Sequence, residues 1–159
     1  MSYDDIGSVL EKMRSFCAYT ERCRSDVSLR LGKWPLSDSE KEEVISILEQ
    51  EGFLNKDRYL SGFVRGKFLN NHWGRVKIKY ELRLKGFTDA EITQALSELD
   101  HDQYTILARR LIEGLIAHRS SMEAFTKKEK EKVIRTMLSR GFEYEVIRQI
   151  FSEGMEIQD

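Results

Sequence analysis

The stretch that decides the fold runs from residue 76 to residue 87 and reads Val76-Lys77-Ile78-Lys79-Tyr80-Glu81-Leu82-Arg83-Leu84-Lys85-Gly86-Phe87. Up to Lys85 it alternates apolar and polar side chains, and this period of two residues is typical of a half-buried β-strand. Taken alone, the stretch therefore fits a strand. A second copy of the pattern elsewhere in the chain argues instead for a helix.

The second copy lies 55 residues further along, where residues 133–153 align with residues 78–98. The identical pairs are Gly86/Gly141, Phe87/Phe142, Ile92/Ile147, Gln94/Gln149, Ser97/Ser152 and Glu98/Glu153. In this copy the apolar residues Val133, Ile134, Met137 and Leu138 follow helical spacing. We therefore predict a helix in both copies.

Two kinds of signal mark the helix boundaries. Three segments fit the capping box, in which a hydroxyl and a carboxylate satisfy free amides of a first helical turn: Ser37-Asp38-Ser39-Glu40, Thr88-Asp89-Ala90-Glu91 and Thr126-Lys127-Lys128-Glu129. Four glycines that precede an aromatic residue are expected to end helices in a left-handed conformation: Gly32, Gly52, Gly86 and Gly141. These signals predict helices over residues 8–23, 26–33, 38–51, 56–71, 74–86, 89–99, 102–119, 127–141 and 143–153.

The order of a long, a medium and a short helix occurs three times, beginning near residues 8, 56 and 102. A spacing of about 46 residues is in the range of helical repeat modules, which bury their apolar stripes against neighbouring modules. We therefore predict an all-α fold without a sheet, built as an elongated, curved array of three three-helix repeats. In this prediction residues 1–159 form a single domain, with repeats at about 8–55, 56–100 and 101–153.

The composition is that of one soluble, folded and highly charged chain. Of its 159 residues, 40% are hydrophobic and 33% are charged, with 26 Lys or Arg against 27 Asp or Glu. One proline and 10 glycines exclude a collagen-like or proline-rich protein. No apolar run approaches the ~20 residues of a membrane span, and no basic leader is present, so we expect a cytoplasmic protein without a membrane partner. Cys17 and Cys23 are interpreted as reduced structural thiols on one helix.

Charge is strongly segregated along the chain. Residues 58–85 hold eight Lys or Arg and one acid, Glu81, whereas residues 88–105 hold five acids and no Lys or Arg. On a helix over residues 74–86, Arg75, Lys79 and Arg83 form one basic stripe, which predicts a surface that follows phosphates. The surface would also include Arg65, Lys67, His72 and Trp73, with the indole stacked on a base. The alternative is a solvated face whose charged groups stay in water.

Signatures of catalysis or of a bound cofactor are missing from the sequence. The histidines His72, His101 and His118 lack metal-ligand spacing with either cysteine, and no glycine-rich phosphate loop occurs. Acids cluster at the predicted starts of helices, where the helix dipole alone favours them. We therefore expect a binding protein that is not an enzyme and that carries no metal and no cofactor.

A series of short motifs runs along most of the chain. They are Glu51-Gly52-Phe53-Leu54-Asn55-Lys56-Asp57-Arg58-Tyr59, Phe63-Val64, Trp73-Gly74-Arg75-Val76-Lys77-Ile78, Leu82-Arg83-Leu84-Lys85-Gly86-Phe87, and Arg140-Gly141-Phe142 followed by Val146-Ile147. In their order and spacing over roughly residues 14–152, these motifs resemble the RecX family of recombination regulators. The third repeat departs from the family pattern, because Glu113-Gly114-Leu115-Ile116 stands where a Lys-rich helix end is usual.

The resemblance implies a modulator of the RecA recombinase that lies in the groove of a RecA filament on DNA. Such a protein blocks filament growth or favours disassembly, and so suppresses ATP hydrolysis, strand exchange and cleavage of the SOS repressor in homologous recombination and DNA repair. The resemblance implies structural roles for Leu82, Gly86, Phe87, Gly141 and Phe142. Contacts with the filament or with single- or double-stranded DNA are predicted for Arg65, Lys67, Trp73, Arg75, Lys77, Lys79, Arg83, Lys85, Arg109 and Arg110.

Two other functions stay open at this point. The first is a helical-repeat protein that binds DNA independently of RecA, which the basic block at residues 58–85 and Trp73 would support. The second is a scaffold of the TPR or HEAT kind that binds a peptide in a concave face. In each case we expect a monomer.

Overall fold

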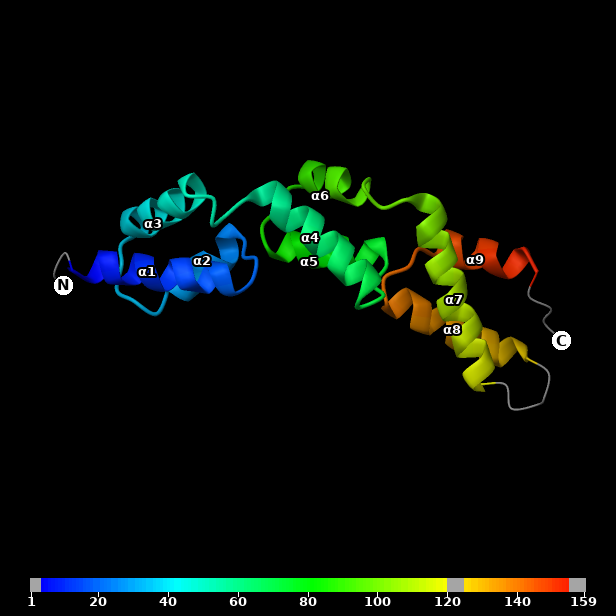
Figure 1. Cartoon of the computed structure of the whole chain (residues 1–159). Helices are drawn as coiled ribbons and strands as arrows, with labels where there is room; N and C mark the ends of the chain where they lie inside the picture. The colour runs from blue at the N-terminus through cyan, green and yellow to red at the C-terminus, as the bar shows by residue number, and fades with distance from the viewer. Residues whose placement is uncertain (1–3, 120–124, 155–159) are drawn as a thin grey trace. The chain divides into compact units, whose positions relative to one another are not determined.

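The structure is a computed structural model that describes residues 4–119 and 125–154, and every regular element within these ranges is a helix. In chain order the helices are α1 (Asp4–Tyr19), α2 (Arg24–Leu31), α3 (Asp38–Gln50), α4 (Lys56–Leu69), α5 (Arg75–Leu84), α6 (Asp89–Leu96), α7 (His101–Arg119), α8 (Lys127–Ser139) and α9 (Tyr144–Ser152) (Figure 1). The all-α prediction is confirmed. The alternating stretch forms α5, and its second copy forms α8.

Most of the predicted helix signals are confirmed. Ser37, Thr88 and Thr126 each cap a helix, and each forms a complete capping box with the glutamate three residues later. Three of the four glycines adopt a positive φ: Gly52 at 79°, Gly86 at 91° and Gly141 at 93°.

The prediction for Gly32 is wrong, because its φ is -59°. The chain leaves α2 through successive bonds to the third residue back, such as Lys33 N to Arg30 O at 3.2 Å and Trp34 N to Leu31 O at 3.1 Å. These tight turns satisfy the last carbonyls of α2, so no left-handed residue is needed.

The first helix was predicted four residues too late at both ends. It stops at Tyr19, because Cys23 adopts an extended backbone and begins the next helix, with its amide bound to the Asp26 carboxylate at 3.1 Å. Cysteine is an unusual residue before a helix, so the sequence carries no ordinary capping signal for this start. Cys17 and Cys23 therefore do not share one helix, although both are free and buried as predicted.

The chain divides into two compact units, residues 1–62 and 63–159. Helix α4 begins in the first unit and continues into the second. The single domain with repeat boundaries near residues 55 and 100 stays a prediction.

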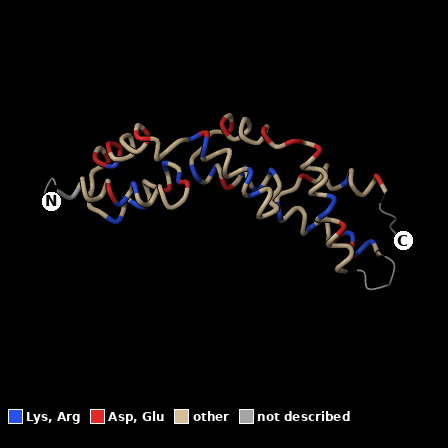
Figure 2. Tube along the Cα trace, viewed as in Figure 1, with Lys and Arg blue, Asp and Glu red and all other residues tan. Residues whose placement is uncertain are grey.

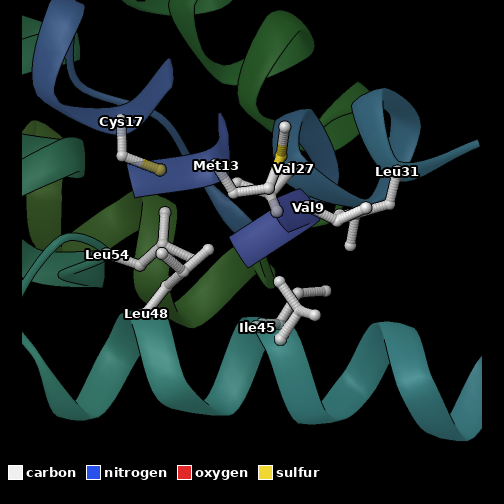
Figure 3. Close-up of a cluster of buried hydrophobic side chains, with 9 residues drawn as sticks. Val9, Met13, Cys17, Val27, Leu31, Ile45, Leu48 and Leu54 are labelled. Carbon is white, nitrogen blue, oxygen red and sulfur yellow. The ribbon is translucent and has the colours of Figure 1, made fainter. Parts of the chain in front are cut away.

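In the first unit, α1, α2 and α3 enclose an apolar core (Figure 3). Its buried members are Val9, Met13, Cys17, Val27, Leu31, Val44, Ile45, Leu48 and Leu54. On α1 and α2 these side chains recur every four residues, and on α3 they lie three or four residues apart, so one face of each helix points inward. Burial raises the pKa of the Cys17 thiol, which keeps it protonated as part of this core.

In the second unit, the start of α5 meets the end of α8. Gly74 N donates to Arg140 O at 2.8 Å, and Val76 N donates to Gly141 O at 2.9 Å. There is no room for a side chain here, because a Cβ on Gly74 would lie 2.3 Å from Gly141 O, and one on Gly141 would lie 2.3 Å from Lys77 Cβ. Two carbonyls just past the end of α8 therefore bind amides at the start of α5, and opposite ends of two helix dipoles meet.

Tyr104 of α7 completes this contact between α5 and α8. Its fully buried ring lies 5.5 Å from Phe68 and 5.4 Å from Phe142, measured between ring centroids. The phenol oxygen accepts a hydrogen bond from the Arg75 backbone amide at 3.0 Å and donates one to the Glu143 carboxylate. The Arg75 guanidinium lies 3.8 Å from the Tyr104 ring centroid and pairs with Glu143 at 2.8 Å.

We call Gly74, Arg75, Tyr104, Gly141 and Glu143 the α5–α8 junction. Burial raises the pKa of the Tyr104 phenol, and its bond to Glu143 raises it further, so the phenol keeps the proton that it donates. The junction joins the two copies of the repeated pattern through backbone bonds and one hydrogen-bonded side-chain group.

Candidate functional site

Helix α5 carries apolar side chains on two opposite faces. Two residues advance a helix by about 200°, so alternate residues fall on opposite sides, whereas residues four apart stay on one side. Ile78 and Leu82 are completely buried. Val76, Tyr80 and Leu84 are 53%, 59% and 66% exposed, and we call these three residues the outer stripe. The strand-like alternation thus comes from a helix with one apolar face in the core and another in solvent.

Two of the three cations in the predicted basic stripe are bound within the molecule. Arg75 belongs to the α5–α8 junction, and its side chain is only 25% exposed. Arg83 donates to Asp89 at 2.8 Å, and this bond holds the pKa of the Asp89 carboxyl below its ordinary value. The charge of Lys79 lowers the pKa of Asp89 in the same direction. A phosphate at this stripe would therefore compete with carboxylates of the protein itself.

Trp73 lies against two lysines. Lys67 Nζ and Lys77 Nζ are 4.7 Å and 4.5 Å from the centroid of its ring. Both distances are in the range of cation–π contacts, in which the ring faces attract the ammonium groups. A base that stacked on Trp73 would have to displace at least one of these contacts, so the predicted stacking role stays a prediction.

The other predicted contact residues lie along α4, the end of α5 and α7. Arg65 is exposed, and Lys85 has an interaction partner within the chain. On α7, Arg110 is exposed, whereas Arg109 pairs with Glu153 at 2.7 Å. In the second unit, α6 carries acidic residues and no Lys or Arg, whereas α5, α7 and α8 carry both signs of charge (Figure 2). The contacts of these residues with a filament or with DNA stay a prediction.

Two features of the second unit were not recognised in the sequence analysis. The first is the exposure of the outer stripe, whose residues belong to the alternating stretch. The second is a row of exposed cations on α8, formed by Lys128, Lys132 and Arg135, which we call the α8 row. These three residues recur at i, i+4 and i+7 and so share one helix face. This spacing is the signal that could have identified them.

The first unit contains a hollow of about 560 Å³ along α1 and α2. Long cations and aromatic rings line it, including Lys12, Phe16, Arg30, Lys33 and Trp34, and its one acid, Glu11, is bound to Arg14. Within the part of the chain that the structure describes, no group of three or more His, Cys, Asp or Glu is placed to hold a metal ion. In the same part, no helix has the length and apolar character needed to traverse a bilayer.

Family models match both copies of the repeated pattern. Residues 57–96 match the second three-helix domain of RecX, and residues 107–151 match its third three-helix domain. These ranges lie inside the second and third repeats predicted from the sequence. Together they cover more than half of the chain.

Individual proteins agree with these matches. The chain is 28% identical over 160 residues to the regulatory protein RecX of Lactococcus lactis subsp. lactis, and 26% identical over 153 residues to that of Geobacillus kaustophilus. The alignments include 99% and 95% of this chain but only 58% and 55% of those proteins, so the chain spans less than two thirds of their length. The crystal structure of RecX from Lactobacillus salivarius is similar with a TM-score of 0.83 and 25% identity, over 96% of this chain and 97% of that chain. The chain therefore belongs to the RecX family.

Proposed function

We propose that this chain regulates the RecA recombinase by binding the RecA nucleoprotein filament. The observation that carries the proposal is the match of residues 57–96 and 107–151 to the second and third three-helix domains of RecX. The similarity to the RecX crystal structure over 96% of the chain supports it, because it extends through the first unit as well.

Binding would inhibit the filament by blocking its growth or promoting its disassembly. Inhibition would then extend to ATP hydrolysis, strand exchange and repressor cleavage, because all three require an assembled filament. The surface that supports this role is α5, where the apolar outer stripe lies beside Lys77, Lys79 and Arg83. Apolar residues bordered by charge are typical of protein interfaces.

The first experiment is a titration of the purified chain into RecA on single-stranded DNA, with ATP hydrolysis as the readout. We expect inhibition at chain concentrations well below that of RecA, because one molecule that stops growth affects many subunits. Free DNA binding is measured in the same buffer. A chain that neither binds RecA filaments nor changes their ATP hydrolysis would contradict the proposal.

A second candidate function is DNA binding without RecA, and the exposed α8 row is the observation that favours it. Lysines and arginines on one helix face bind phosphates and release counterions, so affinity for duplex DNA should fall steeply with salt. Reversal of Lys128, Lys132 and Arg135 to Glu should weaken this binding by about tenfold and reduce the slope of log affinity against log salt by about one per lost contact. An unchanged slope would exclude the α8 row as the DNA contact.

A further inference from the structure

The outer stripe of α5 is an apolar surface that the described fold leaves in solvent. Val76, Tyr80 and Leu84 are each more than half exposed. They are four residues apart, so they form one line along the helix. The opposite face of α5 already supplies its core contacts through Ile78 and Leu82. Binding a partner to such a line of apolar side chains is favourable, because it removes apolar surface from water.

The repeated pattern contains an internal control for this surface. With the 55-residue offset, Ile78 and Leu82 correspond to Val133 and Met137, and all four are buried. The outer stripe corresponds to Glu131, Arg135 and Ser139, which are polar and exposed. The same helix of the repeat thus folds with a polar outer face in α8. Apolar residues at these positions are therefore not a requirement of the fold.

Positive charge borders the outer stripe. From Arg75 to Leu84, α5 contains four Lys or Arg and one acid, Glu81. The cations Lys77, Lys79 and Arg83 each adjoin a stripe residue in sequence. The Lys77 ammonium lies 4.5 Å from the centroid of the Trp73 ring, so its charge is held against the indole that precedes α5. A surface that complements this one has apolar side chains surrounded by carboxylates.

Two observations favour a protein over a nucleic acid as the occupant. Two of the three stripe residues, Val76 and Leu84, are aliphatic and offer no ring on which a base could stack. The guanidinium groups of Arg75 and Arg83 are already paired with Glu143 and Asp89. The apolar contact would therefore supply the affinity, and the bordering cations would set the orientation.

We propose that the outer stripe of α5 docks an apolar surface ringed by Asp and Glu on a protein partner. This inference rests on the proposed function, in which the partner is the RecA filament. It assigns filament contact to Val76, Tyr80 and Leu84, with Lys77 and Lys79 at the border.

The test transfers the outer face of α8 onto α5. The variant Val76→Glu/Tyr80→Arg/Leu84→Ser places at each stripe position the residue that α8 has there. We expect its helicity and melting temperature to match the parent, and its half-inhibitory concentration for RecA ATP hydrolysis to rise by about tenfold or more. Should the triple variant lose helicity, Tyr80→Arg alone gives the same readout at a site that is 59% exposed.

The matched control changes exposed apolar residues on other helices of the second unit. Ile106→Ser/Leu138→Ser/Tyr144→Ser alters side chains on α7, α8 and α9 that are 51%, 43% and 54% exposed. The half-inhibitory concentration of this control for RecA ATP hydrolysis should stay within about twofold of the parent value, because scattered surface apolar residues contribute little to a specific interface.

The outcomes separate the two proposals. Equal inhibition by the stripe variant and the parent overturns the inference and leaves the proposed function standing. A parent chain without effect on RecA overturns both. Two further measurements test for other occupants of the stripe. If light scattering shows that the parent is a dimer and the stripe variant is a monomer, the occupant is a second copy of the chain and the inference is overturned. If the stripe variant also loses binding to free single-stranded DNA, the occupant is DNA and the inference is again overturned.

Discussion

Helices α5 and α8 occupy the same place in successive copies of one repeat, yet they begin in different ways. Both end before a glycine of nearly equal φ, 91° at Gly86 and 93° at Gly141. Helix α8 is capped locally, by Thr126 and Glu129. The cap residue of α5 is Gly74, which has no side chain, and the first amides of α5 are bound by Arg140 O, Gly141 O and Tyr104.

The difference shows how a duplicated helix can come to depend on its neighbour. Helix α8 carries its own start signal, so neighbouring residues cap its first turn. Helix α5 has its start completed by residues that lie far along the chain. The stability of α5 is therefore coupled to the correct folding of α7, α8 and α9.

The largest expected effect comes from a comparison of Gly141→Ala with Gly86→Ala. Both positions have a positive φ, so each substitution strains the backbone by about 1–2 kcal/mol. At Gly86 the added Cβ meets nothing within 4 Å, whereas at Gly141 it lies 2.3 Å from Lys77 Cβ. We expect Gly141→Ala to lower the free energy of unfolding by about 4 kcal/mol or more in total.

Urea unfolding followed by circular dichroism measures both variants against the parent. Gly86→Ala serves as the control for backbone strain alone, because it has a similar φ in open space. Equal losses for the two variants would show that the close approach of α5 and α8 contributes nothing beyond the strain.

Substitutions at the starts of α5 and α8 should lower the free energy of unfolding by smaller amounts. Tyr104→Phe removes the hydroxyl that binds the Arg75 amide and the Glu143 carboxylate. Because it leaves the partly buried Glu143 carboxylate and a first-turn amide without that partner, it should cost about 1–3 kcal/mol. Thr126→Ala removes the local cap of α8 and should cost about 1 kcal/mol.

Hydrogen exchange distinguishes the two variants beyond their stability. Tyr104→Phe should speed amide exchange at the start of α5, and Thr126→Ala should speed it only at the start of α8. Faster exchange in α8 alone for both variants would contradict the dependence of α5 on the junction.

The α5–α8 junction also changes how a charge-reversal variant of α5 has to be interpreted. A joint change of Arg75, Lys79 and Arg83 to Glu tests the predicted basic stripe only if the variant keeps its fold. In the structure, Arg75→Glu would place a second carboxylate against Glu143, so loss of binding could follow from loss of the junction. The outer-stripe variant avoids this ambiguity, because its three residues take no part in the junction.

The sequence predicted the local structure well because the signals involved are local. The three capping boxes and the left-handed Gly52, Gly86 and Gly141 depend on neighbouring residues only, and all were confirmed. Cys23 was missed as a helix start because the Asp26 bond to its amide replaces the usual side-chain signal.

The candidate site was harder to predict because its properties depend on contacts between distant residues. The spacing of Arg75, Lys79 and Arg83 correctly placed them on one helix face, but their partners could not be read from spacing. Arg75 meets Glu143, which is 68 residues away, in a pair that only the folded second unit creates. The exposure of the outer stripe could not be predicted either. The alternating pattern places apolar residues on two faces of α5, and only the folded structure shows which face packs in the core.

The smallest expected effect concerns the pH dependence of the link between α5 and α6. The Arg83 guanidinium lowers the pKa of the Asp89 carboxyl below its ordinary value of 3.8. A lowered pKa stabilises the fold above the ordinary value, and this contribution is lost as the pH falls through the native pKa. In the α8 copy the equivalent residues are Leu138 and Tyr144, so the third repeat has no such pair at this place. Asp89→Asn should therefore make the protein slightly less stable than the parent near neutral pH.

Melting temperatures from about pH 7 to about pH 2.5 test this difference, because the parent and Asp89→Asn should converge only when Asp89 is protonated. The effect should be small, since Arg83 and Asp89 are both exposed and solvent screens the pair. Asp38→Asn, in the first turn of α3, controls for the interaction of an acid with a helix dipole. A difference for Asp89→Asn that persists unchanged at the lowest pH would mean that the effect is packing or capping, and that the ion pair with Arg83 does not stabilise the turn between α5 and α6.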